Sequence, residues 1–432
     1  MTGRAAGLLL LVVAFAVAGD VAGWQLLSQL AMAFLALLVL SFIWTRWSIS
    51  GLEVGRSVSP SRLQVGEVLS DTMTLRSSSQ LGKLWIEARD RCEVPAHNAS
   101  RVVGLSRKGN ESWATRSVCV RRGSFALGPV ELRTGDPLGI FIATKRLPVR
   151  GEVIVYPPVF DLPAMRLPFA DAQGRRELER KALMTTPSVS TVRDYVPGDP
   201  LSKIAWSVTA RTGKLMVKEF DLDPSSEVWV MADFGFDTRV LAERTLVADR
   251  GKRFDVAEAW IDSSEDLVAA LGASVIRVAL DHKRSIGYIG GSAIRRVVQA
   301  DSSERQYHHI LEELALARSD GREQIADVIA SESRRFDRNR TPVVVTASLD
   351  PRWLKALEGL TTRGVRPIAI FVDPGSLSSS IDSSAFLQHT LDQRFPVFVV
   401  DFGDGIAEAF SLESRIARAE EAPRHQLEFA SV

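Results

Sequence analysis

The stretch that decides the fold is residues 191–220, TVRDYVPGDPLSKIAWSVTARTGKLMVKEF. At its start, the residues Val189–Tyr195 alternate in side-chain direction, which is typical of a β-strand. Pro197 and Gly198 supply a turn, and Asp199 is a residue type that caps helices. The first half of the stretch therefore predicts a strand that leads through a turn into a capped helix.

The second half predicts the helix and a second strand. Apolar residues recur at helical spacing and give the helix one apolar face, which we expect to be buried: Leu201, Ile204, Ala205 and Val208. Gly213 suits the end of the helix, because glycine adopts a left-handed conformation at little cost. Leu215–Phe220 then resumes as a strand.

Polar and aromatic side chains are concentrated in this unit. They follow the spacing R-x-Y-x-x-G-D, I-x-W, A-R and L-x-V-x-E, and with this spacing the stretch resembles the bacterial family filed as domain of unknown function 58. The residues that carry the signature are Arg193, Tyr195, Gly198, Asp199, Ile204, Trp206, Ala210, Arg211, Leu215, Val217 and Glu219. The resemblance implies a membrane-anchored protein with a von Willebrand factor type A-like domain and a partner, an AAA+ ATPase of MoxR type.

Two interpretations of the signature stay open. In the first, a salt-bridge network locks the helix between the two strands, and its members are Arg193, Asp199, Arg211 and Glu219. In the second, Trp206 and an arginine anchor a partner protein, because Trp and Arg dominate binding hot spots. Trp206 lies about 200° around the helix from Ile204, so the two cannot share one face.

Composition indicates a globular chain of more than one domain. The 432 residues suffice for two or three domains, and 53 Lys and Arg against 52 Asp and Glu leave a net charge of +1. Such a balance creates no global field that would attract nucleic acid, so no nucleic-acid partner is expected. Cys92 and Cys119 are too few for a disulfide scaffold or a cysteine-built metal site.

Residues 1–47 predict two transmembrane helices. Ala5–Gly19 and Gly23–Trp44 are uncharged apolar runs, which would contact the lipid bilayer through residues 5–44. The only charged residue between the two runs is Asp20, whereas basic residues flank the pair of runs: Arg4, Arg46 and Arg56. The positive-inside rule then predicts a multi-pass protein of the plasma membrane with the bulk of the chain in the cytoplasm. The alternative is a cleaved signal peptide and a secreted protein.

Residues 50–160 predict a small antiparallel β-sandwich. Short alternating stretches are separated by Gly, Pro, Ser and Asn, namely Leu63–Val68, Thr72–Arg76, Leu84–Arg89, Ser117–Arg121 and Val130–Arg133. No catalytic constellation is evident in this part, so it is predicted to be a spacer or a docking surface. Residues 161–188 are polar and poorly periodic, which predicts a linker or flap.

Residues 189–432 join the signature to a predicted α/β domain. Short apolar runs of the buried-strand type are Glu227–Ala232, Ser285–Ile289, Val343–Ala347, Ile368–Val372 and Val397–Val400. Helical stretches alternate with them: Ser264–His282, Gln306–Arg318, Gly321–Phe336, Arg352–Arg363 and Gly405–Ala419. This alternation predicts a mostly parallel sheet covered on both faces, with ligand sites beyond the carboxyl ends of its strands. The layout resembles a von Willebrand factor type A-like domain.

The first of these strands ends in DFGFD, residues 233–237. The type A-like fold carries D-x-S-x-S at this place, so Asp233 matches, while Gly235 and Asp237 replace the serines. Ser348 and Asp350, which follow a later strand, are candidates for the remaining ligands. Because two hydroxyl ligands are missing, the sequence predicts no cofactor, or at most a weak Mg²⁺ or Ca²⁺ site.

The leading hypothesis is a membrane-anchored cytoplasmic adaptor that is not an enzyme. It would work with the MoxR-type ATPase on an unknown client protein, in assembly, maturation or envelope-stress functions. One alternative is a metal-dependent hydrolase that uses Asp233, Asp237 and Asp350. The other is an extracytoplasmic adhesin-like binding protein, which requires the opposite topology and an intact metal loop.

Overall fold

The computed structural model describes residues 3–149, 151–162, 189–194, 204–220, 227–243, 260–391, 393–402 and 406–410. The chain divides into two compact units. The first comprises residues 1–158 and 259–261, and the second comprises residues 159–258 and 262–432. Each unit has its own hydrophobic core, and the two units are described separately.

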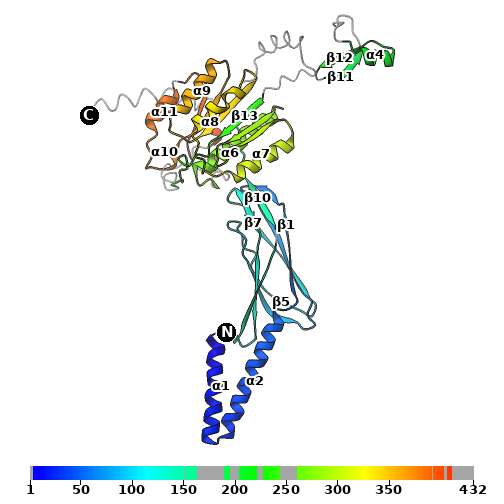
Figure 1. Ribbon diagram of the computed structural model, residues 1–432, viewed down its shortest axis with the longest axis vertical. Coiled ribbons are helices and arrows are strands. Elements are labelled where there is room, and N and C mark those ends of the chain that lie inside the picture. The colour runs from blue at the N-terminus through cyan, green and yellow to red at the C-terminus, as the bar shows by residue number, and fades with distance from the viewer. Residues whose placement is uncertain are drawn as a thin grey trace, which may run out of the picture. The chain divides into compact units, whose positions relative to one another are not determined.

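The first unit begins with two apolar helices, α1 (Gly3–Ala22) and α2 (Gln25–Ser48), which pack side by side as a hairpin (Figure 1). Gly23 turns the chain between them with a φ of 69°, in the region that favours glycine. Both helices are long and apolar enough to cross a membrane. The two predicted apolar helices are therefore present, although Asp20 lies within α1 and not between the helices.

The strands of this unit form three sheets, ordered β1-β3-β6, β2-β10-β7 and β5-β4-β8-β9. Their bounds are β1 (Leu52–Ser59), β2 (Arg62–Gln64), β3 (Val68–Ser77), β4 (Lys83–Asp90), β5 (Arg101–Leu105), β6 (Asn110–Val118), β7 (Gly123–Ala126), β8 (Val130–Gly135), β9 (Ile142–Leu147) and β10 (Glu152–Tyr156). The pairings described are antiparallel except that of β10 with β2, which is parallel. The predicted antiparallel sheets are thus confirmed, with one parallel pair that the sequence did not indicate.

Two predicted strands of this unit are wrong in their bounds. The stretch Leu63–Val68 is not one strand, because Gly66, with a φ of 92°, turns the chain between β2 and β3. The strand predicted to reach Arg121 ends at Val118, because Val118 pairs with Val68, the first residue of the partner strand β3.

The interior of these sheets holds charged side chains among apolar ones. On β3, the inward-facing positions are Leu69, Asp71, Met73 and Leu75, and all four are buried. Arg56 on β1 and Asp90 on β4 are likewise turned inward, with side chains that are 1% and 0% exposed. Three strands therefore bring three charged groups into one interior.

In the second unit, the signature forms a small hairpin of β11 (Val189–Asp194), α4 (Trp206–Thr212) and β12 (Met216–Phe220). Both predicted strands are present, and they pair antiparallel. Gly213 ends α4 with a φ of 69°, also as predicted.

The predicted start of this helix is wrong. Ile204 and Ala205 are buried as expected, but they precede α4. Ile204 forms a β-bridge with Val217, and the Ala205 N–H donates to the Met216 carbonyl. Their backbone groups are committed to β12, so these residues extend the sheet and do not form a helical turn. Leu201 lies outside the described residues.

The rest of the second unit is an α/β domain with the sheet order β15-β14-β13-β16-β17-β18. The strands are β13 (Glu227–Ala232), β14 (Ile286–Gly290), β15 (Arg296–Asp301), β16 (Arg340–Thr346), β17 (Ile368–Val372) and β18 (Val397–Val400). Neighbours are parallel except β15, which pairs antiparallel with β14 at the edge. The mostly parallel sheet is confirmed. The polar edge strand β15 was missed, because an edge strand needs no apolar run.

Helices cover both faces of this sheet (Figure 1). Their bounds are α6 (Ser264–Asp281), α7 (Glu304–Leu316), α8 (Ile325–Glu332), the 3-10 turn η3 (Ser333–Arg335), α9 (Arg352–Thr362), α10 (Pro374–Leu377), α11 (Ser384–Leu391) and α12 (Ile406–Ala409). Trp229 and Met231 pack against α8 and α9, while Val230 lies beside Gly272 of α6. The helix predicted over residues 321–336 is shorter and ends in η3. Of the helix predicted over residues 405–419, the structure describes α12.

Candidate functional site

The first candidate site is the loop that follows β13, at the carboxyl edge of the α/β sheet. Asp233 is its first residue, and its side chain is buried. The Asp233 N–H donates to the Val345 carbonyl of the neighbouring strand β16, so the two loops beyond these strands start side by side. The predicted meeting of the Asp233 and Ser348 loops at one sheet edge follows from the pairing of Ala232 with Val345.

The Asp233 carboxylate links the two loops. Its Oδ2 accepts a hydrogen bond of 2.6 Å from the Thr346 hydroxyl, and its Oδ1 accepts one of 3.0 Å from the Gly235 N–H. Burial raises the pKa of Asp233 to about 6, because desolvation outweighs these two hydrogen bonds, and the charge of Asp237 adds to the rise. At pH 7 this buried carboxyl is therefore closer to its pKa than an ordinary aspartate is.

Gly235 stands where the type A-like pattern has a serine, and its surroundings explain the glycine. A Cβ at this position would lie 2.8 Å from Asp237 Oδ1 and 3.2 Å from Asp233 Oδ1. Gly235 also forms a parallel bridge with Gly321, where a Cβ would lie 2.0 Å from the Gly291 carbonyl oxygen. The close approach of these backbones requires glycine at 321 and favours it at 235.

Ser348 and Asp350 are engaged with protein groups in the loop after β16. The Ser348 N–H donates to Thr346 Oγ1, and the Ser348 carbonyl accepts from Trp353 Nε1 at 3.0 Å. Asp350 Oδ2 accepts from Arg352 Nε at 2.8 Å. Within the described residues, the carboxylates of Asp233, Asp237 and Asp350 do not lie close enough together to form a three-ligand metal site. The one group of three candidate ligands found there lies in the first unit. A weak cation site at this edge stays a prediction.

The second candidate site is the signature hairpin. Trp206, at the first position of α4, is 64% exposed, and Arg211 on the same helix is also exposed. The register places Thr191 opposite Glu219 and Arg193 opposite Val217 in the strand pair. Tyr195, Gly198 and Asp199 lie outside the described residues, as do the side chains of Arg193 and Glu219. The salt-bridge network predicted here therefore stays a prediction.

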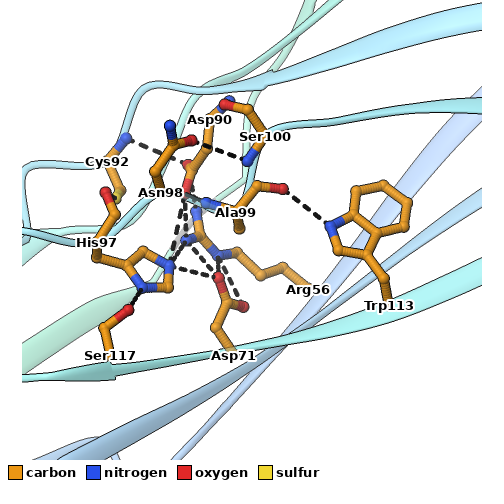
Figure 2. A network of polar contacts seen from close by, with 10 residues as sticks. All are labelled: Arg56, Asp71, Asp90, Cys92, His97, Asn98, Ala99, Ser100, Trp113 and Ser117. Carbon is orange, nitrogen blue, oxygen red and sulfur yellow. Dashed lines mark hydrogen bonds and ion pairs between the residues drawn. The ribbon is translucent and has the colours of Figure 1, made fainter.

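Sequence reasoning missed a third constellation, which lies inside the sheets of the first unit (Figure 2). Arg56 donates to Asp71 Oδ2 at 2.7 Å and to Asp90 Oδ1 at 2.9 Å. His97 Nε2 lies 2.9 Å from Asp71 Oδ2, and its Nδ1 lies 2.7 Å from the Ser117 hydroxyl. The side chains of the four charged or titratable members are at most 1% exposed.

This network favours a structural role. Although burial by itself would raise the pKa of Asp71, hydrogen bonds from His97 and Arg56 outweigh it and hold that pKa below its usual value. Asp90, Cys92 and His97 bring ligand atoms within 4.8 Å of one another. Arg56, however, already donates to both Asp90 oxygens at 2.9 Å, so a cation there would have to displace a guanidinium. We assign the network to the stability of the sheets.

One curated relative is similar to this chain over most of its length. The "Uncharacterized protein YeaD" of Bacillus subtilis (strain 168) is 22% identical over 341 residues, which cover 76% of this chain and 78% of the relative. Among solved structures, the CARDB domain of the PF1109 protein from Pyrococcus furiosus, in complex with di-metal ions, is 12% identical over 24% of this chain and 91% of its own, with a TM-score of 0.18. Proximal thread matrix protein 1 from the mussel byssus is 10% identical over 43% of this chain and 46% of its own, with a TM-score of 0.27.

The structural similarities are too low to carry an argument about fold or function. The signature hairpin and most of the α/β domain match the family described as "Protein of unknown function DUF58" over residues 191–374. The resemblance to the DUF58 family that the signature predicts is therefore confirmed over these residues.

Proposed function

We propose that the protein is a membrane-anchored cytoplasmic adaptor that binds a partner protein through the signature hairpin. The observation that carries this proposal is the exposure of Trp206, a residue that is 64% exposed on a helix of seven residues. Tryptophan is enriched among the residues that dominate binding energy, and so is arginine, here Arg211. The partner is an AAA+ ATPase of MoxR type, the partner that the family resemblance implies.

The architecture supports an adaptor more than a hydrolase. The family resemblance implies that the α/β domain is of the von Willebrand factor type A-like kind. The edge at which such a domain binds its ligand carries the loop from Asp233 to Asp237 here. Asp233 and Asp350 are each held by protein donors, and Gly235 removes one hydroxyl ligand of a cation. Water activation by a metal requires carboxylates that converge on one open position, whereas these two are directed at Thr346 and Arg352.

The adaptor proposal predicts the effect of truncating Trp206. Trp206→Ala should leave the membrane-inserted protein folded, because the side chain is exposed, and should reduce copurification with the MoxR-type ATPase at least about tenfold, as for a hot-spot residue. The measurement is affinity purification of the full-length protein from native membranes, with the ATPase quantified by mass spectrometry.

Ile294→Ala is the matched control, because Ile294 is 67% exposed on another part of the same unit. It should copurify with the ATPase as the wild type does. Equal recovery of the ATPase with Trp206→Ala and the wild type would refute the docking role of the hairpin. Loss of protease resistance in Trp206→Ala would support the structural interpretation instead.

The orientation of the chain is a separate prediction. Arg4 lies in the first turn of α1 and Arg46 in the last turn of α2, so both cations are at the same end of the hairpin. By the positive-inside rule, both ends of the hairpin lie in the cytoplasm. A reporter fused after Val432 should be active in the cytoplasm and inactive in the periplasm. Activity in the periplasm would reverse the topology and remove the ATPase as a direct partner.

A further inference from the structure

We propose that the hollow where α2 meets the β-sheets binds the phosphate headgroup of an anionic phospholipid. This proposal rests on the part of the proposed function in which α2 crosses the membrane. The hollow has a volume of about 570 Å³ and lies within the first unit. Its lining divides into an apolar part, with Phe42, Ile43 and Trp47, and a polar part, with Arg46, Ser50 and Lys145.

The polar part of the hollow is positively charged. Arg46 and Lys145 are exposed, and within the described chain neither has a carboxylate partner. The lining contains no acidic residue. Lys83 lies next to it, where its Nζ donates to the Trp47 and Ser50 carbonyls at 2.8 Å and sits 4.6 Å from the centre of the Trp47 ring. An anion is the ligand that complements Arg46 and Lys145, while the buried Lys83 adds positive charge behind the wall of the hollow.

The position of the hollow, at the end of α2, matches the headgroup region of a bilayer. The 24 residues of α2 span about 36 Å at 1.5 Å per residue, slightly more than the ~30 Å hydrocarbon core of a bilayer. Arg46 lies in the last turn of α2, between Trp44 and Trp47, whose rings contact each other. Tryptophan and arginine at the end of a membrane helix mark the interface between lipid and water.

The sheets are held against the helices at this level. Phe141, in the loop between β8 and β9, packs edge-on against Phe42 with ring centroids 5.7 Å apart. Ile140, from the same loop, is buried with Ala5 and Leu38 of the two helices. The cations from α2 and from β9 are therefore fixed on one body, which can present them to the same phosphate.

An apolar hollow beside the first suits the acyl chain of the same lipid. It has a volume of about 250 Å³, is lined by residues of α1 and α2 and by Phe141, and shares Phe42 with the charged hollow. Phe42 and Ile43 are both more than half exposed, which costs nothing when lipid covers them. A charged hollow joined to an apolar one fits a phospholipid better than a free anion.

The test compares lipids on the purified full-length protein in detergent, by native mass spectrometry. Dipalmitoyl phosphatidylglycerol should remain bound more than the matched phosphatidylcholine. The double variant Arg46→Gln/Lys145→Gln should bind phosphatidylglycerol about tenfold to thirtyfold more weakly, since each basic residue near an anionic surface contributes about a factor of five. The control Arg101→Gln/Arg116→Gln removes two exposed arginines of β5 and β6, and should bind it as the wild type does.

Three outcomes would overturn the proposal: equal retention of both lipids, undiminished phosphatidylglycerol binding in the double variant, or displacement of the lipid by millimolar inorganic phosphate. Extraction of the membranes at alkaline pH separates this proposal from the membrane anchor on which it rests. If the wild type is extracted as a soluble protein, the anchor itself is refuted. If it stays in the membrane but shows no lipid preference, only the headgroup site is refuted.

Discussion

Replacing Arg56 by leucine should lower the free energy of unfolding by about 3–5 kcal/mol, the range measured when one partner of a buried ion pair is removed. Arg56 donates to both Asp71 and Asp90, and the three side chains are at most 1% exposed. Without the guanidinium, two carboxylates stay buried without their cation. Thermal or denaturant unfolding of the full-length protein in detergent measures the loss.

Arg91→Leu is the matched control, because Arg91 forms an exposed ion pair with Glu131 at 3.4 Å. Such a pair contributes about 0–1 kcal/mol. The triple variant Arg56→Leu/Asp71→Asn/Asp90→Asn should recover part of the stability, because it also removes the stranded charges. If Arg56→Leu costs no more than Arg91→Leu, the network does not stabilise the sheets.

The same network predicts a pH dependence. Because the pKa of Asp71 is lower in the folded than in the unfolded state, its stabilising contribution is present above an unfolded pKa of about 4 and is lost as the pH falls through the folded value. The difference in stability between the wild type and Arg56→Leu should therefore shrink below about pH 4.

For Asp233, the pH dependence of stability should have the opposite sign to that for Asp71, and Asp233→Asn should remove it. The folded-state pKa of Asp233 is raised to about 6, so the folded protein binds more protons than the unfolded one between about pH 4 and 6. The wild type therefore loses stability as the pH rises through this window. Asparagine does not titrate, so between pH 4 and 7.5 the variant should gain about 2–3 kcal/mol relative to the wild type, from 1.36 kcal/mol per pKa unit.

The quantity to measure is the change of this difference with pH, because asparagine also alters the hydrogen bonds to Thr346 and Gly235. Asp327→Asn, at an exposed carboxylate in the first turn of α8, is the control, and its stability difference should change by less than about 1 kcal/mol over the same range. A pH-independent difference for Asp233→Asn would show that the pKa of Asp233 is the same in the folded and unfolded states.

Much of the fold followed from periodicity alone. Apolar runs with no polar interruption predicted β13, β17 and β18 to the residue, because strands buried on both faces admit few polar side chains. Helical spacing predicted α6 and α9 to within one residue. Gly213 marked the end of α4, because a left-handed residue there strongly favours glycine.

The candidate sites were predictable only in part. The order of strands and loops indicated that Asp233 and Ser348 meet at one edge, because carboxyl ends of parallel strands lie together. The pairing of Asp233 with Thr346 was missed, since it depends on rotamers. Ile204 was placed on a helix by its spacing, although its backbone belongs to the sheet through Val217.

The sequence by itself determined where most strands and helices of the α/β domain lie. The alternation of β1, β3 and β4 could also have placed Arg56, Asp71 and Asp90 on the inward side of their strands. This alternation is a signal that can be read from the sequence, because a charged residue at an inward, otherwise apolar position must be paired when it is buried. Only the tertiary structure decided which residues pair with one another. Arg56 meets Asp71 because β1 pairs with β3, and it meets Asp90 because β4 of another sheet lies across the interior. Contacts between sheets depend on packing in three dimensions, which the period of one strand does not encode.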